Sequence, residues 1–92
     1  MHIYKSKYVI LDTSTAAVPV VFAEFLTHSD VVRNLTGRTD AVLGAGFCYI
    51  KQTEDGPRYV CYGESVSLRM KARPEEDARI LNKYLGVVVE DL

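Results

Sequence analysis

The sequence predicts an α+β fold in which a mainly antiparallel sheet of about five strands carries two helices, in the order β-β-α-β-β-β-α. Three observations lead to this prediction. Runs rich in Val, Ile and Tyr, which suit a pleated surface, are separated by short polar turns. Two segments carry helix start and stop residues. The connections are mostly too short for the crossovers that join parallel strands, and 92 residues fit a single domain, residues 1–92.

The first two predicted strands are Ile3–Leu11 and Val18–Phe22. The second half of the first strand, Tyr8–Leu11, is apolar at every position, which is typical of an interior strand covered on both faces. Pro19 lacks a backbone N–H and therefore places the second strand at an edge of the sheet.

A short helix is predicted over Thr27–Leu35. Thr27 can cap its N-terminus, and Asp30 follows three residues later in a pattern similar to a capping box. Gly37 supplies the stop, because glycine readily adopts the left-handed conformation that ends many helices.

The next two strands, Ala41–Gln52 and Arg58–Tyr62, flank a turn at Thr53–Gly56. A two-residue Asp-Gly turn would require Pro57 to donate a backbone hydrogen bond, which it cannot do. A four-residue turn instead sets a register in which paired residue numbers sum to 109. This register pairs Cys48 with Cys61, Ile50 with Tyr59, Phe47 with Tyr62, and Gly46 with Gly63. Because neither Gly46 nor Gly63 has a side chain, this pair predicts either a shallow groove or room for an aromatic ring.

After a bend near Gly63 and Glu64, the sequence alternates over Ser65–Ala72 and predicts a strand with one wet face. The apolar face would comprise Val66, Leu68, Met70 and Ala72, and the polar face Ser65, Ser67, Arg69 and Lys71.

The last predicted helix is Pro74–Leu85, with proline at the first helical position and Gly86 as its stop. Three acidic residues follow the proline and complement the positive end of the helix dipole. Val87–Val89 would add a final short strand.

Composition excludes several classes of protein. The chain has 11 basic and 12 acidic residues and a net charge of −1, so it is not a strongly basic chain that binds nucleic acid by charge alone. No segment is apolar for long enough to cross a bilayer, and we expect a cytoplasmic protein. Two cysteines make no zinc site by themselves, and we expect them to be reduced. No metal or cofactor is therefore predicted.

Catalytic motifs are absent or incomplete. His28-Ser29-Asp30 has the residues of a hydrolase triad, but consecutive helical residues point in different directions. Gly44-Ala45-Gly46 lacks the third glycine of a dinucleotide fingerprint and leads into a strand, so a bulge or a close backbone approach explains it better. A small enzyme would need a cleft that joins Glu64, Ser65 and His28. Glu64, beside the bend, is otherwise a candidate carboxylate for binding a ligand.

A basic face is a second candidate site. Its charged residues lie within a short segment that contains one acid, Glu64, and tyrosines lie nearby, so the face could bind single-stranded nucleic acid by charge and stacking. The acidic run that begins at Glu75 could neutralise it. The candidate residues are Arg58, Tyr59, Arg69, Lys71 and Arg73, with Tyr49 and Tyr62 close in sequence.

Two stretches resemble a group of short uncharacterised proteins carried by bacteriophages and prophages. One stretch is Phe22–His28. The other is Cys61-Tyr62-Gly63-Glu64-Ser65-Val66-Ser67-Leu68, followed by Arg73-Pro74-Glu75-Glu76-Asp77-Ala78. The resemblance implies a phage or bacterial origin and an accessory role, and it carries no site residues.

The chain is thus expected to be a small non-enzymatic binding or interaction protein. Its six tyrosines and the predicted edge strand favour a homodimer that acts through the sheet face or edge. The alternatives are a weak single-stranded nucleic-acid-binding protein and a small enzyme.

Overall fold

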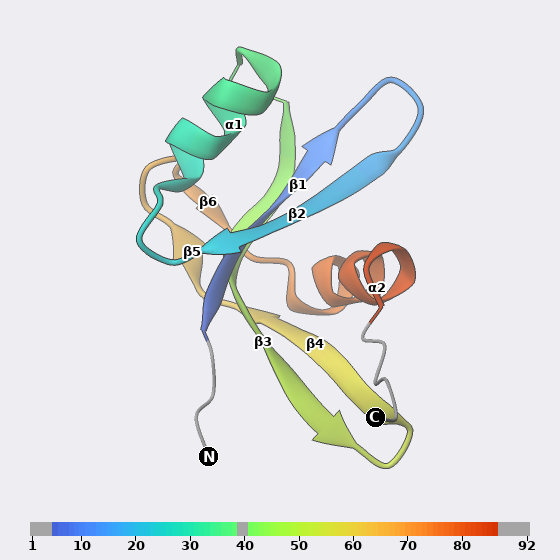
Figure 1. The fold of residues 1–92 in the computed structure, drawn as a ribbon. Helices are drawn as coiled ribbons and strands as arrows, with labels where there is room; N and C mark the ends of the chain where they lie inside the picture. Colours follow the sequence, from blue (N-terminus) through green and yellow to red (C-terminus); the bar gives the residue numbers. More distant parts are fainter. Residues whose placement is uncertain (1–4, 39–40, 87–92) are drawn as a thin grey trace.

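The computed structural model describes residues 5–38 and 41–86 and confirms the α+β class and the element order. A four-stranded antiparallel sheet of order β2-β1-β3-β4 and a separate two-stranded hairpin, β5-β6, carry the two helices (Figure 1). The elements are β1 (Ser6–Asp12), β2 (Ala17–Ala23), α1 (His28–Thr36), β3 (Val42–Thr53), β4 (Gly56–Tyr62), β5 (Glu64–Ser65), β6 (Met70–Lys71) and α2 (Pro74–Tyr84). Neither helix in these two ranges has the length and apolar character needed to cross a membrane.

β1 is an interior strand, and its segment Tyr8–Leu11 is buried on both faces, as predicted. Tyr8 and Ile10 pack toward α2, in a cluster with Cys48, Cys61 and Leu81. Val9 and Leu11 pack in a second cluster with Val32 of α1, Val42 and Ala45. Leu68 and Met70, at the β5-β6 hairpin, add to this second cluster. One side of the sheet is therefore covered by α2, and the other by α1 and the hairpin (Figure 1).

Both helices begin and end close to the predicted residues. Thr27 caps α1, where its side-chain oxygen accepts the Asp30 N–H at 3.2 Å. Gly37, with φ of 73°, donates its N–H to the Arg33 carbonyl at 2.8 Å. α2 begins at Pro74 as predicted. The predicted strand Val87–Val89 lies outside the described residues.

The β3-β4 register is confirmed. Cys48 lies opposite Cys61, and the ladder continues to the last pair, Thr53 and Gly56, so Glu54 and Asp55 form the tip of the hairpin. The two cysteines are buried and are not joined by a disulfide. Burial raises the pKa of the Cys48 thiol to about 11 and that of Cys61 to about 12. Both thiols are therefore protonated core side chains.

The predicted β3-β4 pairing stops one pair early at the end of the ladder that lies away from the turn. The ladder ends at Phe47 and Tyr62, one pair short of the predicted Gly46–Gly63 pair. Gly63 adopts φ of 78° and turns the chain out of β4, which confirms the bend. Pro19 lies on β2, which is an edge strand as predicted.

The prediction of one strand over Ser65–Ala72 is wrong. The segment is a tight hairpin in which β5 and β6 are two residues each, and the intervening turn is closed by the Arg69 N–H on the Val66 carbonyl at 3.2 Å. Ser65 is buried and its hydroxyl accepts the Leu68 N–H at 3.1 Å, whereas Val66 is 82% exposed. Serine hydroxyls that bond nearby backbone groups compete with a strand ladder, so Ser65 is buried and Val66 exposed, contrary to the prediction. Leu68, Met70 and Ala72 remain half-buried, and Arg69 and Lys71 exposed, as predicted.

A buried carboxylate fixes α2 to the sheet. Asp77 is fully buried and accepts hydrogen bonds from the Tyr8 hydroxyl and from the Arg73 N–H and Nε, the last two at 2.9 and 3.0 Å. A Cβ built on Gly44 would lie 2.5 Å from an Asp77 oxygen. The glycine-rich segment is thus a close backbone approach, and beside it the β1-β3 register shifts between Ile10 and Leu11, where the pairing skips Leu43 of β3.

Candidate aromatic and cationic site

The candidate site starts with a row of paired residues that crosses the sheet on the α1 side. Lys7 of β1 pairs with Phe47 of β3, and Phe47 pairs with Tyr62 of β4. Directly paired residues in an antiparallel sheet project from the same face. The alternating positions that follow on β3, Tyr49 and Lys51, share this face.

Three rings form a continuous cluster on this face, which we call the aromatic strip: Phe47, Tyr62 and Tyr49. The rings of Phe47 and Tyr62 are stacked, with centroids 5.8 Å apart and planes 28° apart. Tyr49 meets Tyr62 edge-on, also at 5.8 Å. Both separations lie in the range of favourable aromatic pairs.

Cations flank the aromatic strip at both ends. The ammonium groups of Lys5 and Lys7 lie 4.7 and 5.9 Å from the centroid of Phe47, which is cation–π distance. At the other end, exposed Lys51 and Arg58 are paired across β3 and β4. The protein is nearly neutral overall, but this face concentrates positive charge beside aromatic rings.

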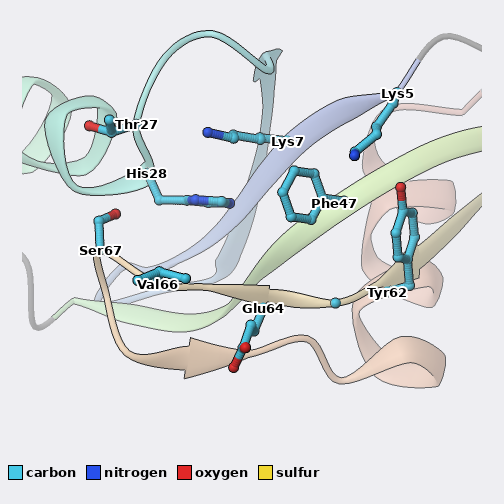
Figure 2. Close-up of a pocket in the computed structure, with 10 residues that line it drawn as sticks. Lys5, Lys7, Thr27, His28, Phe47, Tyr62, Glu64, Val66 and Ser67 are labelled. Carbon is cyan, nitrogen blue, oxygen red and sulfur yellow. The ribbon is translucent and has the colours of Figure 1, made fainter.

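A groove of about 540 Å³ lies where the aromatic strip meets α1 and the β5-β6 hairpin (Figure 2). Its rims differ in character. Lys5, Lys7 and Thr27 lie on one side, and Val66 and Ser67 on the other (Figure 2). The complete lining is Lys5, Lys7, Thr27, His28, Phe47, Tyr62, Gly63, Glu64, Val66 and Ser67.

His28 is nearly fully buried in this groove. Its Nε2 donates to the carbonyl of Gly46 at 2.8 Å, and its ring packs edge-on against Phe22 and Phe47, at 5.4 and 6.1 Å. Burial lowers the pKa of His28, and the nearby Lys7 ammonium lowers it further. A neutral ring that donates from Nε2 carries no proton on Nδ1.

The end of the groove is closed by contacts between α1 and the hairpin. The Ser29 N–H donates to the Ser67 hydroxyl at 3.1 Å. Lys7 Nζ donates to the Leu26 carbonyl at 2.9 Å and fixes the loop before α1. Gly63 lies against Phe47, since a Cβ there would be 3.1 Å from the ring. Of the two glycines that the sequence predicted to face each other, Gly63 lines the groove.

The carboxylate and hydroxyl candidates are only partly brought together. Glu64 lines the groove, but its carboxylate points away from Phe47 (Figure 2). Ser65 is buried and bonded to the Leu68 N–H. The cleft that a small enzyme would require, joining Glu64, Ser65 and His28, is therefore not formed in the described structure.

The predicted basic residues are spread over three parts of the molecule. Of these residues, Arg58 lies on the same face as the aromatic strip. Tyr59 is on the opposite face, where its N–H donates to Asn82 Oδ1 at 2.8 Å and burial raises its pKa. Arg69 and Lys71 belong to the hairpin turn and β6, with Lys71 opposite Glu64.

Arg73 has a structural role instead. Its guanidinium lies 2.9 Å from Asp77 and 3.0 Å from Glu76. The acidic run therefore neutralises this member of the patch, as the sequence suggested it could.

Sequence reasoning missed the two lysines and the role of Phe47. The signal was available in the register, because Phe47, Tyr49 and Lys51 alternate along one strand. Arg58 and Tyr62 alternate with them along its partner. The two lysines enter only through the pairing of β1 with β3, which the sequence did not specify.

Within residues 5–38 and 41–86, no group of three or more His, Cys, Asp or Glu side chains is placed to hold a metal ion. Comparisons with protein-family models, with curated proteins and with solved structures found no match.

Proposed function

We propose that this protein is a non-enzymatic binding module whose ligand is single-stranded nucleic acid. One observation carries the proposal: three contiguous rings lie on one sheet face with cations at both ends. Aromatic rings supply stacking surfaces that accept any base, and lysine and arginine attract the phosphates.

The geometry favours single strands over duplexes. The rings lie on a sheet face, and a base can stack on a ring only when its own face is free. In a duplex the base faces are covered by their neighbours. Each base–aromatic contact contributes roughly 1–3 kcal/mol in alanine-substitution experiments, and charge attraction of the phosphates by the flanking cations adds to it.

The test is fluorescence anisotropy with labelled single-stranded DNA, single-stranded RNA and duplex DNA at low and moderate salt. We expect single strands to bind more tightly, with affinity that falls steeply as salt rises. Lack of binding to single strands at low salt contradicts the proposal.

A matched pair of variants locates the site. Tyr62→Ala should weaken single-strand binding by about 5- to 150-fold, which corresponds to the loss of one stacking contact. Tyr84→Ala is the control, because Tyr84 also has a lysine near its ring, Lys83 at 5.3 Å, but lies at the end of α2. Equal effects of the two substitutions would place binding elsewhere.

Homodimerisation is the second proposal, and it concerns the edge of the sheet. β2 is an edge strand of seven residues, and Phe25, just after it, is 83% exposed. An open edge can pair with a second copy of itself across a two-fold axis. Light scattering at high concentration should then give about twice the chain mass of 10.3 kDa, and a monomer contradicts this proposal.

A cytoplasmic location and a phage or bacterial accessory role complete the proposal. The support for the location is a pair of buried cysteine thiols, which suit a reducing compartment. The accessory role is supported by the sequence resemblance alone.

A further inference from the structure

The aromatic strip leads into the groove and stops there. Beyond Phe47 the same sheet face is covered by α1 and the β5-β6 hairpin, which are joined by the Ser29–Ser67 hydrogen bond. A strand that follows the rings past Phe47 and Lys7 toward α1 therefore meets a wall. A chain in the middle of a long nucleic acid would have to turn away from the sheet at this point, whereas a chain end would not.

The chemistry at this point suits a doubly charged group. Lys5 and Lys7 flank one ring, with ammonium groups 4.7 and 5.9 Å from the Phe47 centroid (Figure 2). Lys7 uses one N–H on the Leu26 carbonyl, so donors remain for a ligand. The other ionisable groups of the groove do not oppose an anion at this position, because His28 is held neutral by burial and the Glu64 carboxylate points away (Figure 2).

A terminal phosphomonoester carries a charge of about −1.5 to −2 at pH 7. An internal phosphodiester carries a single negative charge. The terminal group also offers three oxygens to charge-assisted hydrogen bonds. Two ammonium groups that flank one ring attract the more highly charged terminal phosphate more strongly than one isolated lysine would.

We infer that the groove is a binding site for the terminal phosphomonoester of a single strand whose last bases stack on the aromatic strip. This inference rests on the proposed function. The protein would then recognise phosphorylated strand ends, with the base contacts supplied by the aromatic strip and the phosphate contacts by Lys5 and Lys7.

The experiment compares four labelled DNA ligands of one sequence: a 5′-phosphorylated strand, a 3′-phosphorylated strand, a strand with two hydroxyl ends, and a circular single strand. We expect one of the phosphorylated strands to bind about tenfold more tightly than the hydroxyl and circular ligands. Equal affinity for all four overturns the inference and leaves the proposed function standing. Failure of all four to bind overturns both.

Two lysine variants complete the test. Lys5 is exposed, so Lys5→Gln should fold normally and should abolish the preference for the phosphorylated end. Lys51→Gln, at the other end of the strip, should weaken all four ligands by a similar factor and preserve the preference. A preference that survives Lys5→Gln unchanged overturns the assignment of the groove as the phosphate site.

Discussion

Replacement of Gly44 by alanine should destabilise the fold strongly, because the new methyl group would collide with a carboxylate that has nowhere to go. Its Cβ would lie 2.5, 2.6 and 2.8 Å from three atoms of Asp77. Asp77 is fully buried and is held by Tyr8 and by the backbone and side chain of Arg73. The clash can be relieved only by moving α2 or by breaking some of these bonds.

The change in the free energy of unfolding combines two destabilising contributions and one stabilising contribution. Overpacking a core costs roughly 1–3 kcal/mol, and losing a hydrogen bond to a buried charged group costs about 1.5–3 kcal/mol. Alanine restricts the conformations of the unfolded chain, which stabilises the folded state by about 0.4–1 kcal/mol. The free energy of unfolding should therefore fall by about 3 kcal/mol. For a domain of this size, that lowers Tm by at least about 12 °C.

Chemical and thermal unfolding followed by circular dichroism would measure the effect. Gly37→Ala is the control, because that glycine has φ of 73° and open space around its Cβ position. It should lose only about 1 kcal/mol from the left-handed conformation. In an Asp77→Ala background, Gly44→Ala should cost almost nothing, because the colliding carboxylate is gone. A small effect in the wild type, or additive effects in the double variant, would refute the reasoning.

Three further predictions concern the thiols, the α1 cap and the buried histidine. With pKa values of about 11 and 12, Cys48 and Cys61 should react with a disulfide reagent at pH 8 only after denaturation, and rapid labelling of the native protein would contradict their placement. Thr27→Ala should lower the free energy of unfolding by about 1 kcal/mol while Thr27→Ser has little effect, and equal losses in urea denaturation would argue against the cap. Because the pKa of His28 is lowered in the folded state, the unfolded chain takes up the proton first, so stability should fall as the pH drops below about 6.5, by at most about 1.4 kcal/mol per pH unit. His28→Gln should flatten that part of the curve of Tm against pH, and an unchanged slope would mean that another group is responsible.

The sequence was informative wherever a local signal decides the structure. Thr27 and Gly37 bound α1, Pro74 starts α2, and Pro57 correctly excludes the short Asp-Gly turn. The register that follows is confirmed pair by pair from Phe47 onward. These features depend on capping, on missing N–H groups and on period-two alternation, all of which act over a few residues.

The sequence was misleading where a local side-chain bond competes with a periodic pattern. Over Ser65–Ala72 the alternation was regular, yet the Ser65 hydroxyl bonds the Leu68 N–H and a turn replaces the strand. The predicted basic residues are dispersed in the structure for a different reason. Arg73 is close in sequence to Arg69 and Lys71, but its contacts with Asp77 depend on tertiary packing that no spacing rule contains.

The lengths of the elements explain why a binding face is left on the α1 side. β3 has 12 residues and extends about 40 Å, whereas the nine residues of α1 extend about 14 Å. α1 and the short hairpin therefore cover the first part of β3, where Val42 and Ala45 are buried, and leave the part that carries Phe47, Tyr49 and Lys51 less covered. Aromatic pairs across strands stabilise a sheet by themselves. The cations at both ends of this strip add the charge that an anionic ligand with stacking faces requires, and this combination is the physical argument for a ligand.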